Sequence, residues 1–268
     1  MMYSKREAMC QSASIIMKEK VIVMRVIRTK DLKDAGMHTA AVIAAEVTLK
    51  PNCVLGLATG SSPIETYEYL VDWYNQGDLD FSKVRAVNLD EYVGLPADHD
   101  QSYAWFMRHY LFDHINIDLK NTYIPNGLET DGVKEGARYD AIIDELGGVD
   151  LQLLGIGPNG HIGFNEPGEE FVPGTHCVDL TETTIAANAR FFESVDMVPK
   201  QAYSMGVKGI MQAKRVVMVA TGKNKAQAIR DAFCGPVTPK VPASILQLHP
   251  DFILVADEDA MSLVGDAL

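Results

Sequence analysis

The sequence lacks the marks of several large protein classes. Only four cysteines occur among its 268 residues, and they form neither a C-x-x-C pair nor a zinc-like spacing with histidine. No run of about 18 apolar residues is present, so no transmembrane helix is predicted. A disulfide framework of the kind found in short secreted chains is therefore excluded. We expect reduced cysteines, no metal site and a cytoplasmic protein.

Basic residues are also scarce. The chain has 24 Lys and Arg against 36 Asp and Glu, which gives a formal net charge of −12. A protein that binds nucleic acid usually presents a basic face, so this balance argues against such a partner. The glycine-containing turn Thr59-Gly60-Ser61-Ser62 is neither a Walker loop nor a G-x-G-x-x-G fingerprint, and we expect no cofactor. A small anionic ligand in a locally basic site stays compatible with the overall charge.

We expect one folded unit after a short N-terminal extension. Apolar stretches within residues 1–23 are too short for a signal peptide, and we expect a flexible extension there. No linker rich in Pro, Gly or Ser divides the remainder, so we predict a single catalytic domain over 24–268. Composition excludes wholesale disorder, since 47% of the residues are apolar and 22% are charged.

Short apolar runs alternate with segments of helical period. Runs of this length and composition suit strands that are buried on both faces, and they lie at 53–58, 84–89, 149–154, 216–220 and 252–256. Helices are expected from the capping box Ser62-Pro63-Ile64-Glu65 onward, and at 102–114, 133–146 and 224–233. The alternation predicts an α/β fold with a doubly wound, mostly parallel, Rossmann-like sheet and helices on both faces.

Ligands of open parallel sheets bind beyond the carboxyl ends of the strands, where this chain places its unusual turns. The turn Thr59-Gly60-Ser61 follows a predicted strand and precedes a predicted helix. Backbone N–H groups and a helix N-terminus in such a turn suit a phosphate group. A tight connection without a ligand explains the same residues equally well. Asp90 and Glu91 follow the next strand, where Asp90 is a candidate general base and a capping role is the alternative.

The richest segment is 155–168, which packs five Gly and two Pro into 14 residues. Between them stand Asn159, His161, Asn165 and Glu166. Histidine is the side chain best suited to proton transfer near neutral pH, and a carboxylate five residues later could hold its ring in one tautomer. A structural histidine is the alternative, but the position at the ligand edge favours function.

Cationic side chains follow later in the chain. Arg190 suits bidentate contact with phosphate. Lys223 and Lys225 stand at the predicted start of a helix, where a cation is unfavourable unless an anion compensates it. A solvated surface pair of lysines is the alternative.

Taken together, these stretches resemble the glucosamine-6-phosphate deaminase family. The matching segments are LGLATGSSP (55–63), NLDEYVGLP (88–96), GIGPNGHIGFNEPG (155–168), ANARFF (187–192), TGKNKAQA (221–228) and LQLHPDF (246–252). The resemblance implies aldose–ketose isomerisation with loss of ammonia, which turns glucosamine 6-phosphate into fructose 6-phosphate. The implied partner is a small sugar phosphate, without a cofactor.

The resemblance also implies residue roles. Asp90 would move a proton from C2 to C1, and His161 with Glu166 would open the sugar ring. Some family members have Asp where this chain has Asn159, which cannot ionise, so we expect an orienting role there. The implied phosphate ligands are Thr59, Gly60, Ser61, Arg190 and Lys225, while Lys223 stands beside the family's lysine position.

Other functions share this pattern. A 6-phosphogluconolactonase or another sugar-phosphate isomerase would keep the phosphate loop and the fold. A non-catalytic sugar-phosphate sensor domain would carry a DNA-binding module, and no helix-turn-helix is evident. The chain has no long segment after the last predicted strand, which resembles the short, non-allosteric family members. We therefore expect a monomer or a small homo-oligomer.

Overall fold

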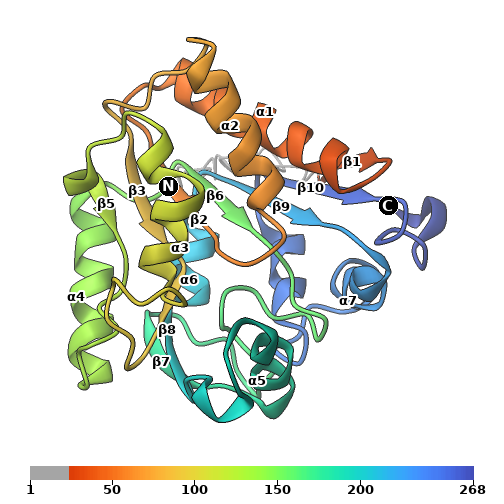
Figure 1. Ribbon diagram of the computed structural model, residues 1–268. Coiled ribbons are helices and arrows are strands. Elements are labelled where there is room, and N and C mark those ends of the chain that lie inside the picture. The colour runs from red at the N-terminus through yellow and green to blue at the C-terminus, as the bar shows by residue number, and fades with distance from the viewer. Residues whose placement is uncertain (1–23) are drawn as a thin grey trace, which may run out of the picture.

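A parallel sheet organises the computed structural model, which describes residues 24–268; the expected extension at 1–23 lies outside this part. The sheet has seven strands in the order β1-β10-β9-β6-β2-β3-β5 (Figure 1). All neighbouring strands in it pair in parallel. The fold class predicted from the sequence is confirmed.

The strands of this sheet take in every apolar run predicted as a strand. They are β1 (Arg25–Thr29), β2 (Val54–Leu57), β3 (Arg85–Asn88), β5 (Thr122–Tyr123), β6 (Leu151–Leu154), β9 (Arg215–Ala220) and β10 (Phe252–Asp257). All residues of β2, β6 and β10 are buried, as expected for strands covered on both faces. The edge strand β1, which the sequence analysis missed, pairs with β10.

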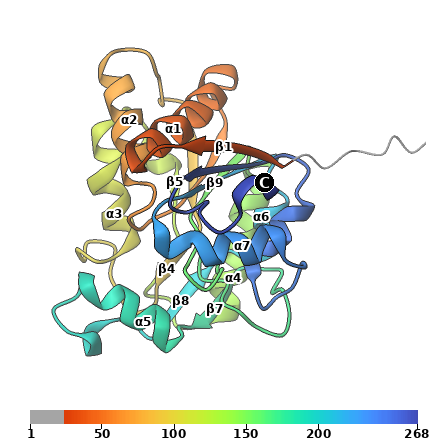
Figure 2. The ribbon, with the colours of Figure 1, turned by 90° about the vertical axis from the view of Figure 1, so that its right-hand side faces the viewer.

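Helices cover both faces of the sheet. The α-helices of the described chain are α1 (Leu32–Leu49), α2 (Ile64–Asn75), α3 (Tyr103–Tyr110), α4 (Gly132–Glu145), α5 (Glu182–Asn188), α6 (Val207–Met211) and α7 (Ala226–Cys234), of which all but α5 cover the sheet. Right-handed crossovers place α1, α2 and α3 on one face and α4, α6 and α7 on the other, as Figure 2 shows. In the described part of the chain, no helix is long and apolar enough to cross a membrane.

The predicted capping box at the start of α2 is wrong. The helix begins at Ile64 with Pro63 as its N-cap, and no side chain caps it. Pro63 already has helical dihedrals, φ −86° and ψ −5°, so Ser62 precedes the cap position. The side chain of Ser62 instead borders the cavity described below.

A second, three-stranded sheet contains the acidic residues Asp90 and Glu91. It has the order β4-β8-β7, with β4 (Asp90–Tyr92), β7 (His176–Asp179) and β8 (Gln201–Ser204) paired antiparallel. Asp90 and Glu91 were expected in a turn but lie in β4. The non-local pairing with β8 extends the chain there, and it fixes Asp90 opposite Ser204.

The direction of strand addition reverses between β2 and β6. From β2 the chain adds β3 and β5 outward, and it then returns to add β6, β9 and β10 on the other side. Such a switch point leaves a crevice at the carboxyl ends of the two central strands. The loops that follow β2 and β6, at 58–63 and 155–168, both begin at this crevice.

Candidate active site

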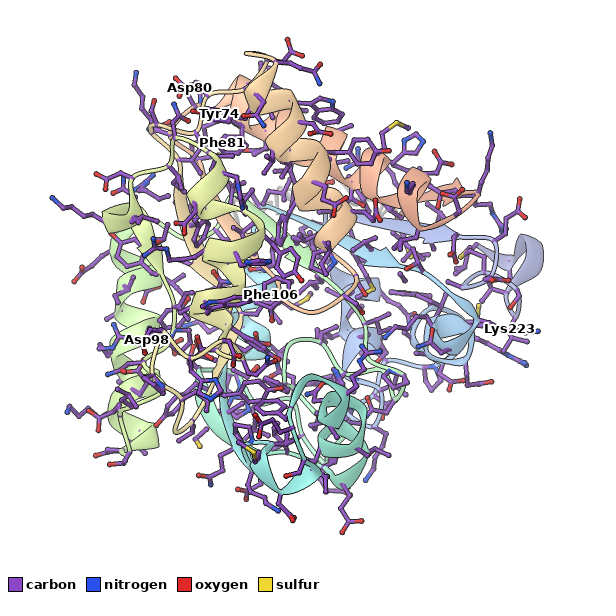
Figure 3. The ribbon with its side chains drawn as sticks, in the orientation of Figure 1. Tyr74, Asp80, Phe81, Asp98, Phe106 and Lys223 are labelled. Carbon is purple, nitrogen blue, oxygen red and sulfur yellow. The ribbon has the colours of Figure 1, made fainter. Side chains whose placement is uncertain are left out.

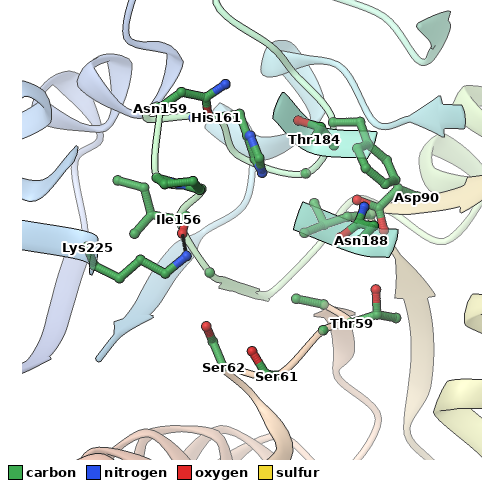
Figure 4. Close-up of a pocket in the computed structure, with 18 of the residues that line it drawn as sticks. Thr59, Ser61, Ser62, Asp90, Ile156, Asn159, His161, Thr184, Asn188 and Lys225 are labelled. Carbon is green, nitrogen blue, oxygen red and sulfur yellow. Dashed lines mark hydrogen bonds between the residues drawn. The ribbon is translucent and has the colours of Figure 1, made fainter. Parts of the chain in front are cut away.

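A cavity of about 290 Å³ opens at this crevice (Figure 4). The loops after β2 and β6, strand β4, helix α5 and the segment before α7 all contribute to its wall. The structure thus brings together most of the residues singled out from the sequence, and those that line the cavity are Thr59, Gly60, Ser61, Asp90, Asn159, His161, Arg190 and Lys225. Glu166 stands one layer behind, in contact with Asn159.

The loop after β2 turns sharply at a glycine. Gly60 has φ +91°, a left-handed conformation that side chains with a Cβ rarely adopt. The turn passes from the end of β2 at Leu57 to the first turn of α2 at Ile64. Ser61 and Ser62 of this turn lie at the cavity wall, next to the N-terminus of α2, and the N-terminus of a helix favours an anion (Figure 4).

Two cations, Lys225 and Arg190, also line the cavity. Lys225 donates a hydrogen bond from Nζ to the carbonyl oxygen of Ile156 at 2.6 Å, which extends the side chain into the cavity (Figure 4). Burial lowers the pKa of Lys225, and the nearby positive charge of Arg190 lowers it further. Two like charges this close favour an anion between them.

Lys223 has a different position. It is exposed at the start of the 3₁₀ turn Lys223–Lys225, and its side chain points away from the molecule (Figure 3). Its neighbour Asn224 borders the cavity, whereas Lys223 does not.

Asp90 is a buried carboxylate at the cavity wall. Asp90 is only 6% exposed. Burial, together with the charge of Glu91, raises the pKa of its carboxyl to about 8. Gly163 lies next to this carboxylate, since a Cβ at that position would stand 3.4 Å from Oδ2 of Asp90. A carboxyl whose pKa lies near neutral pH is suited to accept and return a proton.

Glu91 points away from Asp90 and is held by backbone. Its carboxylate accepts hydrogen bonds from the N–H groups of Tyr92 at 2.8 Å, Tyr103 at 2.9 Å and Ala104 at 2.9 Å. The last two N–H groups belong to the first turn of α3, which has no earlier carbonyl to bond. Burial raises the pKa of Glu91 to about 7, and the three hydrogen bonds limit that rise.

The loop at 155–168 is fixed by its glycines and by backbone bonds. Gly160 and Gly163 have φ of +85° and +57°. The N–H of Gly157 donates to the carbonyl oxygen of His161 at 2.9 Å, which closes a turn around Asn159. Asn165, predicted only as a polar residue of this segment, anchors the loop by donating to the carbonyl oxygens of Ile162 and Met205.

This turn sets His161 beside a carboxylate. Nδ1 of His161 lies 3.6 Å from Oε2 of Glu166, and both side chains are largely buried. Asn159 donates from Nδ2 to the same Oε2 at 2.8 Å, and its Oδ1 accepts the backbone N–H of His161 at 3.2 Å. Burial raises the pKa of Glu166, but the hydrogen bonds from Thr184 and Asn159 and the neighbouring imidazole of His161 lower it by more, so the net shift is downward. Glu166 therefore stays ionised near neutral pH.

The sequence analysis missed several residues of the wall. Besides Ser62, they include Tyr103, Thr183, Thr184, Asn188 and Asn224. Thr184 and Asn188 lie one helical turn apart in α5, and Asn188 donates to the hydroxyl of Tyr92 at 2.9 Å. Their spacing of four residues, directly before Arg190, is the signal that could have identified them.

Comparison with known proteins relates this site to one family. Residues 29–254 match the family described as glucosamine-6-phosphate isomerases/6-phosphogluconolactonase. The chain belongs to this family. A glucosamine-6-phosphate deaminase of Lachnoclostridium phytofermentans is 57% identical over 232 residues, which cover 87% of this chain and 98% of that protein. A deaminase of Clostridium perfringens is 52% identical over 241 residues, which cover 90% of this chain and all of that one.

Solved structures of the family have the same fold. A monomeric glucosamine-6-phosphate deaminase superposes with a TM-score of 0.88 at 43% identity, over 90% of this chain and 100% of that one. A 6-phosphogluconolactonase from Trypanosoma cruzi has a TM-score of 0.75 at 18% identity, over 91% of this chain and 98% of the other. The second likeness carries the fold alone. Within the family, the deaminase resemblance noted in the sequence is confirmed.

Proposed function

We propose that the chain converts glucosamine 6-phosphate and water into fructose 6-phosphate and ammonium. The observation that carries the proposal is that one cavity is lined by Asp90, by the cation Lys225 and by His161, which has Glu166 beside it. Relatives that bear the deaminase name match this chain at 50% identity and above over nearly its full length, which supports the same activity here.

The phosphate would bind between the turn after β2 and the two cations. Thr59, Gly60 and Ser61 offer backbone and hydroxyl donors, while Lys225 and Arg190 supply charge. Binding a group that does not react fixes a small, flexible sugar in the cavity, and this remote binding energy orients the reacting carbons.

Ring opening would fall to His161. Its imidazole takes the proton of the anomeric hydroxyl and delivers a proton to the ring oxygen, which leaves an open-chain aldehyde. Glu166 stabilises the imidazolium that forms in between, because it stays ionised and lies 3.6 Å from Nδ1. Asn159 would orient both partners through its amide without adding a charge.

Isomerisation would fall to Asp90. Its carboxylate takes the proton from C2 and an enolamine forms; a proton then returns to C1 and leaves an imine at C2. Water adds to this imine, and ammonium leaves. A base in this step must be ionised when substrate binds, and the substrate's ammonium group favours that state by its positive charge.

We also propose an oligomeric state. One of the solved relatives is described as monomeric, and it superposes over nearly the whole of this chain. We infer that the protein is a monomer. Light scattering after gel filtration should then give a mass near 29.4 kDa.

Two assays on the purified protein test the proposed reaction. We expect release of ammonium and fructose 6-phosphate from glucosamine 6-phosphate, in equal amounts. Hydrolysis of 6-phosphogluconolactone, the activity of the alternative family branch, should stay at the uncatalysed rate. Lactone hydrolysis without ammonium release would assign the chain to the other branch, and neither activity would favour a sensor.

A further inference from the structure

Helix α5 contacts Glu166 directly. Thr184, in the first turn of this helix, is only 5% exposed, and its hydroxyl donates a hydrogen bond to Oε1 of Glu166. The other carboxylate oxygen, Oε2, accepts from Asn159 at 2.8 Å and faces Nδ1 of His161. Each oxygen of Glu166 thus has its own donor.

A second hydroxyl orients Thr184. Thr181, the N-cap of α5, donates from Oγ1 to Oγ1 of Thr184 at 3.1 Å and accepts the backbone N–H of Thr184 at 3.3 Å. A hydroxyl has one hydrogen, so the bond received from Thr181 leaves that of Thr184 directed at Glu166. Successive bonds of this kind polarise one another, and a charged acceptor strengthens the last of them.

The terminal torsion of a glutamate is soft, so its packing does not fix the direction of the two oxygens. A single donor on Oε2 would leave the carboxylate free to rotate about that contact. The donor on Oε1 removes this freedom, and it keeps Oε2 turned toward the imidazole of His161.

We propose that Thr184 is a positioning residue for sugar-ring opening, which acts by holding the carboxylate of Glu166 against His161. The inference rests on the proposed function. Because Arg190 follows in the 3₁₀ turn Ala189–Phe191 directly after α5, one segment carries both a phosphate contact and the donor that orients Glu166. A substrate phosphate that fixes this segment would also fix the ring-opening pair.

The test replaces the hydroxyl without changing the shape of the side chain. Thr184→Val should lower kcat for ammonium release by about tenfold, the usual effect of one charge-assisted hydrogen bond, with KM changed less than about twofold. Thr184→Ser keeps the donor and should recover most of the loss. Thr48→Val, at an exposed threonine of α1 remote from the cavity, should match the wild type.

Looser packing of α5 is the competing explanation. Ile185→Val controls for it, because Ile185 packs α5 against the small core around Tyr92 and Phe164 but has no bond to Glu166. This variant should raise KM and leave kcat nearly unchanged. Thr184→Val should thus change mainly kcat, and Ile185→Val mainly KM. This difference distinguishes positioning of Glu166 from attachment of the helix.

A double-mutant cycle links the effect to Glu166. In a Glu166→Gln background, Thr184→Val should cost less than about threefold, because the charged acceptor is already gone. Equal losses in both backgrounds, or a Val variant with wild-type kcat, would overturn the inference. If the wild type releases no ammonium at all, the proposed function fails instead, so the two failures are distinct.

Discussion

The imidazole ring of His161 lies directly against Cα of Gly157, where any Cβ would overlap three ring atoms. Gly157→Ala should therefore displace the ring from Glu166. The methyl group meets the end of a side chain that can rotate away, so the fold should tolerate it. We expect a loss of kcat of about tenfold to a hundredfold, as for a misplaced proton-transfer group, with a melting temperature close to wild type.

Steady-state kinetics and thermal unfolding measure the two quantities separately. Gly155→Ala is the matched control, because a Cβ there stays 3.6 Å from its nearest neighbour, Cβ of Ser62. Full activity of Gly157→Ala would mean that the observed ring position does not matter for turnover.

The charge of Glu91 should be visible in the pH dependence of activity. Burial and Glu91 both raise the pKa of Asp90, to about 8, and the base must be ionised to act. In Glu91→Gln the second cause disappears, so the pKa of Asp90 falls. The acid limb of kcat/KM should then move to lower pH.

Glu91→Gln should also lower stability, since an amide cannot accept all three backbone N–H groups at the start of α3. A shift of the acid limb is a separate effect, because lost stability alone changes the amount of active enzyme and not its pKa. An unmoved limb would mean that Glu91 acts on the fold only.

Ionisation of Asp90 should lower the free energy of unfolding as the pH rises. Its folded pKa of about 8 lies above the ordinary unfolded value near 4, so the folded state binds the extra proton between these values. The contribution of Asp90 to stability is therefore greatest below about pH 4 and falls through the window up to pH 8, by at most about 1.4 kcal/mol per pH unit.

Asp90→Asn removes that titration. The variant should gain stability relative to wild type as pH rises from 4 to 8, and denaturant unfolding at a series of pH values measures the difference. A constant difference across the series would contradict the raised pKa.

Neighbouring lysines should differ in their effect on phosphate binding. Lys225→Met removes a cation from the cavity, and we expect the Kd for inorganic phosphate to rise about tenfold or more. Lys223→Met has the same chemistry at an exposed position outside the cavity and should leave the Kd unchanged. Equal effects of both changes would indicate that only overall charge matters.

Arg190→Ala should weaken the same affinity. The guanidinium lies at the cavity wall after α5, and its contribution should fall as salt concentration rises. Calorimetric titration with phosphate at two salt concentrations measures both effects. An unchanged affinity would place the phosphate elsewhere.

The parallel core could be predicted because its signals are local. Strands such as β2 and β10 are buried on both faces, so apolar composition alone identifies them. In the partly exposed edge strand β1, Arg25 and Arg28 flank only two aliphatic residues, which gives no comparable run. The helices that were expected held to within a few residues, although the capping box of α2 was wrong and α1 was missed.

The site could be predicted where single residues carry the chemistry. Asp90, His161 and Lys225 stand out by type and by their position after strands. Thr184 does not, because its role comes from contact with Glu166 across eighteen residues of chain. The extended conformation of Asp90 and Glu91 likewise depends on pairing with β8, more than a hundred residues away.

The most direct test of the account is ammonium release by Asp90→Asn. Asparagine keeps the shape of the side chain but cannot take the C2 proton, so binding of glucosamine 6-phosphate should stay within about threefold of wild type while kcat falls by about 10²-fold to 10⁴-fold. Isothermal titration and a coupled ammonium assay on the same preparation measure the two numbers. Turnover within a few-fold of wild type would contradict the assignment of Asp90 as the base.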